Sequence, residues 1–232
     1  PSLADDSNPI VGRDGRLIPV IVGIGNHEVN GGYNKGRDQA PFFYALFDGL
    51  VPEPGYATLD FGDYLSVVLL DTGHTSPIGG AQAEWLEQAL RARKDRPHLF
   101  VVNHVPAYPS YRKMEGAPAA EGRAARVGTG EENRKYWVPL FEKYRVPVVL
   151  EHHDHTFKRT YPLKGGMKDR YGVPYLGDGS WGQLRTPISP EKRPYLAHVS
   201  RSYHMTVHRL DGDQRYHVAL EEGGRIADVD GS

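Results

Sequence analysis

The sequence contains no cysteine. Disulfide bonds, zinc sites built from thiolates and cysteine nucleophiles are therefore excluded together. Any metal ion must instead be bound by His, Asp, Glu or Asn side chains, and the chain has 11 histidines. The positions of these histidines therefore become the first question.

Long apolar runs are also missing. Apolar runs such as Val20 to Ile24 and Val67 to Leu70 are only strand-sized, well below the roughly 18 residues that suggest a membrane span. The formal net charge is -1 and no long basic run occurs, which argues against a groove for nucleic acid. A chain of 232 residues without an internal linker is predicted to form a single domain over residues 1–232.

The first residues carry no targeting signal. The chain begins at Pro1, without an initiator methionine and without a charged segment followed by an apolar one. Residues 1–16 have the Pro, Asp, Asn and Gly content of a loop. We therefore expect the sequence to begin within a longer protein.

Strand and helix patterns alternate through the middle of the chain. We expect strands over 16–24, 98–103 and 147–150, hairpins over 58–70 and 203–220, and helices over 81–93 and 131–143. Residues 107–130 are predicted to form a long surface loop because Gly, Ala, Pro and charged residues dominate them. This order indicates an α/β layered sandwich.

Three short polar motifs each follow a predicted buried strand. They are Gly25-Asn26-His27-Glu28, Asn103-His104 and His152-His153-Asp154-His155. In open α/β sheets, ligands bind at the carboxyl ends of the strands. A lone loop histidine is usually solvated or hydrogen-bonded, but three such clusters at one edge favour a metal site. In an extended segment, His153 and His155 would project to the same face and ligate one ion or two adjacent ions.

These motifs resemble those of the calcineurin-like metallophosphoesterases, and the purple acid phosphatase branch is the most similar. The resemblance rests on Gly-Asn-His-Glu at 25–28, on His104 in HVPAY and on His-x-His at 153–155, followed by Arg159. It continues through segments 70–74 and 137–155 and covers nearly the whole chain. It implies an α/β/β/α layered sandwich with mixed central sheets, whose amino-terminal strands are missing from this chain.

The resemblance also implies a function and a role for each motif residue. The protein would hydrolyse phosphate esters with two metal ions (Fe, Zn or Mn) and metal-bound hydroxide, as an acid phosphatase-like phosphomonoesterase. Asn26, His104 and His153 would ligate one ion, and His155 the other. His27 would face the phosphate and protonate the leaving group. The substrate would be a small-molecule phosphate ester, and the relatives imply export to the periplasm or the extracellular space.

One departure from the family pattern concerns carboxylates. The family's earlier motifs, one of which bridges both ions through a carboxylate, precede Gly-Asn-His-Glu, and the 24 residues before Gly25 contain none of them. We therefore expect an upstream segment to complete the site. We also expect the 232 residues alone to bind metal weakly and to turn over little substrate.

Other departures lie near the histidines. His152 stands where the family has Gly, which we interpret as a tolerated loop substitution, with an extra imidazole near the phosphate as the alternative. In the loop after His104, Tyr111 and Arg112 are candidate substrate-binding residues, although an ordinary solvated charge explains Arg112 equally well. His74 is a weaker candidate for the same site.

The remaining candidates are structural. Asp71 and Arg159 are interpreted as residues that support the ligands. The later histidines are interpreted as surface or satisfied polar residues; they are His98, His198, His204, His208 and His217. Two other functions stay open: a phosphodiesterase or nucleotide hydrolase with the same site, and a truncated, non-catalytic domain that binds metal or phosphate.

Overall fold

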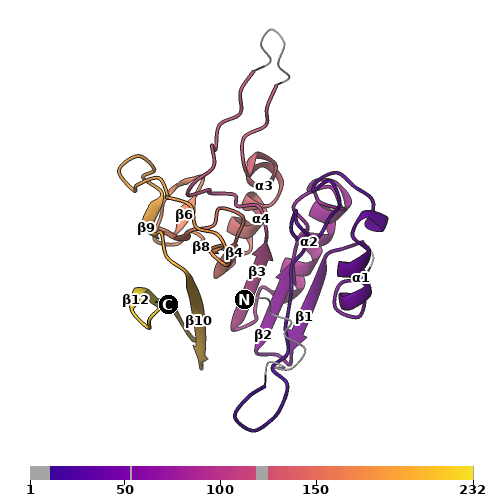
Figure 1. Ribbon diagram of the computed structural model, residues 1–232, viewed down its shortest axis with the longest axis horizontal. Coiled ribbons are helices and arrows are strands. Elements are labelled where there is room, and N and C mark those ends of the chain that lie inside the picture. Colours follow the sequence, from indigo (N-terminus) through magenta and orange to yellow (C-terminus); the bar gives the residue numbers. More distant parts are fainter. Residues whose placement is uncertain (1–10, 53, 119–124, 232) are drawn as a thin grey trace.

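The computed structural model describes residues 11–52, 54–118 and 125–231 (Figure 1). The helices in these ranges are η1 (Arg37–Gln39), α1 (Pro41–Phe47), α2 (Ala81–Arg93), α3 (Glu131–Tyr136) and α4 (Val138–Lys143). The strands are β1 (Ala57–Phe61), β2 (Leu65–Leu69), β3 (His98–Asn103), β4 (Val148–Glu151), β5 (Phe157–Thr160), β6 (Leu163–Lys164), β7 (Met167–Lys168), β8 (Tyr175–Asp178), β9 (Leu196–Ser200), β10 (His204–Asp211), β11 (Gln214–Glu221) and β12 (Ile226–Gly231). None of these helices has the length and hydropathy that crossing a bilayer requires.

The central sheet has the strand order β1-β2-β3-β4-β8-β5-β9. Its strands β2, β3, β4 and β8 are parallel, and β1, β5 and β9 run antiparallel to their neighbours. Side chains alternate between two cores: Val68 of β2 packs with Leu86 of α2, whereas Val67 packs with Phe43 of α1. The mixed α/β layered fold predicted from the sequence is confirmed.

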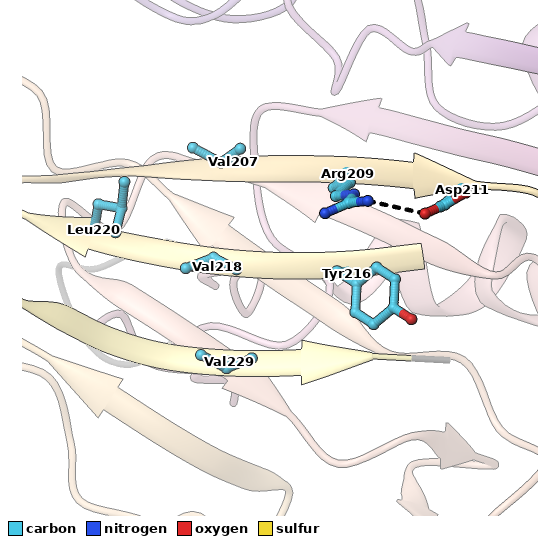
Figure 2. A pocket seen from close by; sticks show the side chains of 7 residues that line it. All are labelled: Val207, Arg209, Asp211, Tyr216, Val218, Leu220 and Val229. Carbon is cyan, nitrogen blue, oxygen red and sulfur yellow. Dashed lines mark hydrogen bonds and ion pairs between the residues drawn. The ribbon is translucent and has the colours of Figure 1, made fainter. Parts of the chain in front are cut away.

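A second sheet, with the order β10-β11-β12, lies against the central sheet. The rings of His208 and His217 lie 5.4 and 6.2 Å from that of Phe100 in β3, so their face of the sheet is the inner one. The predicted hairpin 203–220 is confirmed, and β12 extends it. On the outer face, the paired residues Val207, Val218 and Val229 line an apolar hollow of about 450 Å³ (Figure 2).

Two other predictions hold, and one needs correction. The hairpin 58–70 and the helix 81–93 are present as β1–β2 and α2. The predicted helix 131–143 is interrupted at Trp137, which separates α3 from α4. Pro139 has no amide hydrogen to continue the helical bonding, and the next turn restarts where Leu140 and Phe141 donate to the Trp137 carbonyl at 2.9 Å.

The predicted strand over 16–24 is wrong. Residues 18–25 belong to no strand, and the only pairing near them within the described residues is the bridge between Val11 and Leu17. Leu17 is 73% exposed and Val20 52% exposed, whereas Ile24 is buried. An apolar run forms a strand only where neighbouring strands satisfy its backbone groups, and here only the end of the run reaches the core.

The predicted surface loop 107–130 needs correction at its beginning, because Ala107, Tyr108 and Ser110 are buried and the first two belong to the core; the rest forms a long arm. In Figure 1 its two limbs leave the body side by side. Ala117 and Arg126 connect the limbs by two backbone hydrogen bonds of 2.8 Å. Residues 119–124 of the predicted loop lie outside the described residues.

A buried ion pair lies where β4 and β5 meet the loop after β3. The Lys158 ammonium is 2.5 Å from the Glu151 carboxylate, and both side chains are buried. The amide of Ala107 donates to Glu151 at 2.6 Å, and Lys158 also donates to the Tyr108 carbonyl. One pair of charges therefore connects two strands to the loop that begins at His104.

Breaking this pair is expected to destabilise the fold strongly. Lys158→Met leaves the Glu151 carboxylate buried without its cation, which costs roughly 3–5 kcal/mol of unfolding free energy. The double variant Glu151→Leu/Lys158→Met removes both charges and is expected to recover much of that loss. Urea unfolding of the two variants measures the difference, and a double variant no more stable than the single one would contradict this account.

The β1–β2 hairpin is held to α2 by a pair with a defined pH response. Arg93 donates to both carboxylate oxygens of Asp60 at 2.7 Å and holds the pKa of Asp60 at about 2. This value lies below the unfolded-state pKa of about 3.9, so the carboxylate stabilises the fold above that pH and loses its contribution as the pH falls toward 2.

Asp60→Asn is therefore expected to lower the melting temperature at pH 7 and to make it fall less between pH 4 and pH 2.5. Asp95→Asn serves as the matched control. The Asp95 side chain is exposed, and its one ion pair is a long surface contact of 3.6 Å with the exposed Lys94. An equal fall of the melting temperature between pH 4 and pH 2.5 in the parent chain and in Asp60→Asn would show that Asp60 does not cause this dependence.

Candidate metal centre

Three of the predicted ligands meet at the carboxyl ends of the parallel strands. His104 follows β3 directly, His153 follows β4 after one residue, and Asn26 lies in a turn after the extended segment 18–25. Nε2 of His104 lies 2.8 Å from Oδ1 of Asn26 and 2.9 Å from Nδ1 of His153. Asn26 and His104 are 78 positions apart in the sequence, and His104 and His153 are 49 positions apart. The fold nevertheless brings their polar atoms to one point.

Close backbone approach at Gly25 makes this meeting possible. A Cβ atom at that position would lie 2.9 Å from the His104 ring and 2.9 Å from the Glu28 carboxylate. The Gly25 amide donates to that carboxylate at 2.8 Å, which closes the turn. The glycine of the Gly-Asn-His-Glu motif is thus required by packing against the second histidine motif.

Burial keeps the two imidazoles neutral. Burial, together with the smaller effect of the neighbouring His153, lowers the pKa of His104 to about 2. Burial and the Arg112 guanidinium lower the pKa of His153 to about 4. Neutral imidazole and amide oxygen are both groups that coordinate metal ions.

The spacing of these atoms also fits a common metal ligand set. Metal–nitrogen bonds are about 2.1 Å long, so two ligands at right angles lie about 3.0 Å apart, close to the separations around His104. Within the described residues, however, no group of three or more His, Asp or Glu side chains is placed to hold an ion. The chain therefore supplies two imidazoles and one amide at this point, a partial ligand set.

His155 and His27 lie beside this group without joining it. Nδ1 of His155 is buried and has no hydrogen-bond partner among the described residues, as expected of an atom that a cation would satisfy. Burial lowers the pKa of His155, with smaller effects from Arg112, Arg185 and His27. His27 is exposed, so its ring is open to a solvent-borne ligand.

The His-x-His segment is a turn, so the extended geometry expected from the sequence is wrong. His153 and His155 have φ values of 69° and 55°, in the left-handed region that costs a non-glycine residue about 1–2 kcal/mol. Gly179 packs against this turn, where a Cβ would lie 3.0 Å from the His155 amide nitrogen. The two rings consequently have different surroundings: the His153 ring contacts His104 and Tyr33, and within the described residues the His155 ring makes no hydrogen bond to either.

Asp154, between these histidines, holds the turn in place. Its buried carboxylate accepts hydrogen bonds from the amides of Ser110 and Tyr111 at 2.6 and 2.8 Å and from the Arg112 guanidinium at 3.1 Å. Arg112 also donates to the His153 carbonyl at 2.6 Å. This role of Asp154 was not predicted from the sequence. The one available signal was the position of an aspartate between the two histidines of the motif.

The two residues expected to bind substrate lie at this connection. Arg112 uses one guanidinium nitrogen for Asp154 and His153, and about a third of its side chain stays exposed. The Tyr111 side chain is exposed, with the Arg185 guanidinium 5.8 Å from its ring centroid. Both residues border the site, and the bonds of Arg112 give it a structural role as well.

His74 adjoins the site but is fully engaged. Its Nδ1 is 2.7 Å from the Gly32 carbonyl and its Nε2 3.0 Å from the Thr72 hydroxyl. Its ring centroid lies 5.4 Å from that of His104. Asp71 accepts the His74 amide at 2.7 Å and shapes this loop. The His74 ring therefore packs beside His104, and Asp71 fixes the loop that carries His74.

The structure gives His152, Arg159 and His98 hydrogen-bond partners outside the three converging residues. Nδ1 of His152 is 3.0 Å from the Asn103 carbonyl, which fits the substitution at this position being tolerated. Arg159 pairs with Asp228 of β12 at 2.5 Å. His98 is buried, with Nε2 2.9 Å from the Gly212 carbonyl.

Tyr33 is a site residue that sequence reasoning missed. Its hydroxyl lies 3.3 Å from Nε2 of His153, and its ring centroid is 4.7 Å from that of His74. Burial raises the pKa of the phenol, which therefore stays protonated at neutral pH. The only available signal was a tyrosine shortly after Gly-Asn-His-Glu, in a segment with no recognisable pattern.

A cavity of about 370 Å³ opens beside His153. Tyr33, Thr72 and Val105 line it, together with residues 127–133 at the base of the arm and the start of α3. Glu131 and Glu132 belong to its lining, and no lysine or arginine does. The larger hollow on the outer face of the second sheet shares no lining residue with this cavity.

Comparison with known proteins identifies the family of the chain. The model of the calcineurin-like phosphoesterase family matches residues 4–157. Acid phosphatase type 7 of Mus musculus is 28% identical over 167 residues, which cover 63% of this chain and 37% of the relative. An uncharacterised protein of Mycobacterium tuberculosis is 31% identical over 220 residues, which cover 86% of this chain and 36% of the relative.

A solved structure shares the fold. The purple acid phosphatase PPD1 from yellow lupin (Lupinus luteus) seeds superposes with a TM-score of 0.73 and 16% identity, covering 90% of this chain and 39% of that one. At that identity the likeness concerns the fold alone. The chain thus spans somewhat more than a third of the length of the relatives it matches.

Removing the Asp154 carboxylate is expected to release the turn that carries His153. Asp154→Ala leaves the amides of Ser110 and Tyr111 without their acceptor, which costs roughly 2–4 kcal/mol of unfolding free energy at about 1–2 kcal/mol for each amide. Asp211→Ala is the control, because that carboxylate pairs with Arg209 on the surface, and its loss costs at most about 0.5 kcal/mol. Equal urea midpoints for the two variants would refute the role of Asp154.

Proposed function

Because the chain belongs to the calcineurin-like phosphoesterase family, we propose that it hydrolyses phosphate esters at a dinuclear metal centre. The observation that carries this proposal is the convergence of Asn26 Oδ1, His104 Nε2 and His153 Nδ1 on one point. These three residues would hold one ion, Fe, Zn or Mn, and His155 would contribute to the second. Carboxylates from a segment outside these residues would complete the ligand sets.

Bound ions would supply Lewis-acid chemistry, lowering the pKa of a water molecule and neutralising phosphate charge. The chain's own part is to present neutral donors at fixed positions and to supply protons. His27, exposed beside His155, is proposed to face the phosphate and to protonate the leaving alcohol. Arg112 is proposed to attract the phosphate with its exposed portion, and Tyr111 to border it.

The cavity beside His153 supports a choice of substrate. It has room for a small alcohol group, and its lining carries Glu131 and Glu132 without a basic residue. Carboxylates repel the further phosphates of a nucleotide di- or triphosphate. We therefore propose phosphate monoesters of uncharged or cationic alcohols, in keeping with the acid phosphatases among the relatives, ahead of nucleotides.

One observation favours a second function. The described residues bring only two imidazoles and an amide to the meeting point, so the chain by itself is also a candidate for a domain that binds metal or phosphate without turnover. The two functions differ in whether hydrolysis accompanies binding.

Assays of p-nitrophenyl phosphate and its bis-ester, each with added Mn²⁺, Zn²⁺ or Fe²⁺, test the proposal. From these residues alone we expect slow metal-dependent hydrolysis, with the monoester as the better substrate. His104→Ala should reduce this rate by more than about 100-fold, since loss of an outer partner alone costs 10–100-fold. His198→Ala is the matched control, because the His198 ring packs against Phe157 away from the donor atoms.

Three outcomes are decisive. A better rate with the bis-ester would favour a phosphodiesterase. Metal binding with no hydrolysis of either ester would favour the non-catalytic domain. An unchanged rate in His104→Ala would show that the meeting point around His104 is not the site.

A further inference from the structure

Tyr33 is held at the edge of the candidate metal centre by its neighbours in the chain. The amides of Asn34 and Lys35 donate to the carbonyls of Gly73 and His74 at 2.8 and 2.9 Å. The Gly32 carbonyl is in turn 2.7 Å from Nδ1 of His74. These bonds fasten the loop that carries Tyr33 to the loop after β2, so the position of the phenol is set by backbone contacts.

The phenol occupies two surroundings at once. Its ring packs against His74 at 4.7 Å between centroids and meets the His153 ring edge-on, at 84° and 6.4 Å. It also lines the cavity beside His153, where 37% of the residue remains exposed. The hydroxyl is thus able to contact His153 on one side and a bound molecule on the other.

The hydrogen bonds around His104 bear on which ring nitrogen of His153 carries its proton. An amide oxygen only accepts hydrogen bonds, so Nε2 of His104, 2.8 Å from Asn26 Oδ1, carries a hydrogen. In the metal-free chain this N–H is shared between Asn26 Oδ1 and Nδ1 of His153, which lies 2.9 Å away. It favours an accepting Nδ1, but a shared hydrogen bond leaves the tautomer to be fixed from the other side of the ring. With Nδ1 accepting, the proton of the His153 ring lies on Nε2, which faces the Tyr33 hydroxyl at 3.3 Å.

We propose that Tyr33 is a positioning residue: its hydroxyl accepts the Nε2 proton of His153 and so keeps Nδ1 bare and directed at the point shared with Asn26 and His104. This inference rests on the proposed function, in which Nδ1 is the coordinating atom. A histidine that binds a metal commonly donates its other ring N–H to an outer partner, which fixes its tautomer and orientation. Within the described residues, Tyr33 is the side chain placed to accept that proton.

Tyr33→Phe separates positioning from packing. The variant keeps the ring against His74 and removes only the hydroxyl, so its melting temperature is expected to match that of the parent chain. Nitrogen-15 NMR of the histidine rings in the metal-free chain is expected to show His153 mainly protonated on Nε2 in the parent and as a mixture of both tautomers in the variant. An identical tautomer pattern in the two chains would overturn the proposal.

A second measurement tests the consequence for binding. Calorimetric titration with Zn²⁺ or Mn²⁺ is expected to show about tenfold weaker affinity for Tyr33→Phe, the lower end of the range for outer partners, because water reaches this partly exposed position. Tyr171→Phe is the matched control, since the Tyr171 side chain is 72% exposed and remote from these contacts. Equal affinity in Tyr33→Phe and the parent would also overturn the proposal.

The two hypotheses fail in different ways. A parent chain that binds neither ion contradicts the proposed metal centre, whereas the tautomer comparison in the metal-free chain still decides the role of Tyr33. Tyr33→Leu provides a further distinction. It removes both hydroxyl and ring, and a tautomer change seen only in this variant, with a lowered melting temperature, would assign Tyr33 to packing alone.

Discussion

The buried ion pair between Glu151 and Lys158 is the constraint on which the site's geometry depends. Glu151 ends β4 and Lys158 lies in β5, so the pair spans the turn that contains His153 and His155. The Glu151 carboxylate also accepts a hydrogen bond from the Ala107 amide, and Lys158 donates one to the Tyr108 carbonyl. Both residues belong to the loop that starts at His104. A buried pair of this kind adds little net stability, but removal of one partner is costly, so it specifies how these segments dock.

Strain and compensation are distributed around this pair. The turn after β4 places His153 and His155 in left-handed backbone conformations, which an isolated segment would avoid. Asp154 offsets that cost with hydrogen bonds to the amides of Ser110 and Tyr111. The loop after β3 is therefore attached to this segment at several points, through Asp154 and Glu151 and also through the His152 amide, which donates to the His104 carbonyl at 3.0 Å. The short distance between His104 and His153 follows from these attachments.

What could be predicted from the sequence was mostly what local pattern controls. The hairpin β1–β2, the helix α2 and the strand β3 follow from periodicity and turn residues, and the position of His104 directly after β3 follows from the same pattern. The segment 16–24 failed because a strand needs partners that its own composition does not reveal. The roles of Asp154 and Tyr33 were not predicted for a related reason. Each acts through residues far away in the sequence, and neither position shows a periodic signal.

The charges around the meeting point explain why the chain's own donors are only part of a site. Asn26, His104 and His153 are neutral when they present their lone pairs, so they offset none of the charge of a cation. The charged side chains nearby are already engaged: Glu28 accepts the Gly25 amide beside the His104 ring, and Asp154 pairs with Arg112, which lowers the pKa of His153. A cation at this point therefore needs anionic partners beyond these three residues, carboxylates or the phosphate of a substrate. Binding of a phosphate ester and binding of metal should then reinforce each other, because each supplies the charge that the other lacks.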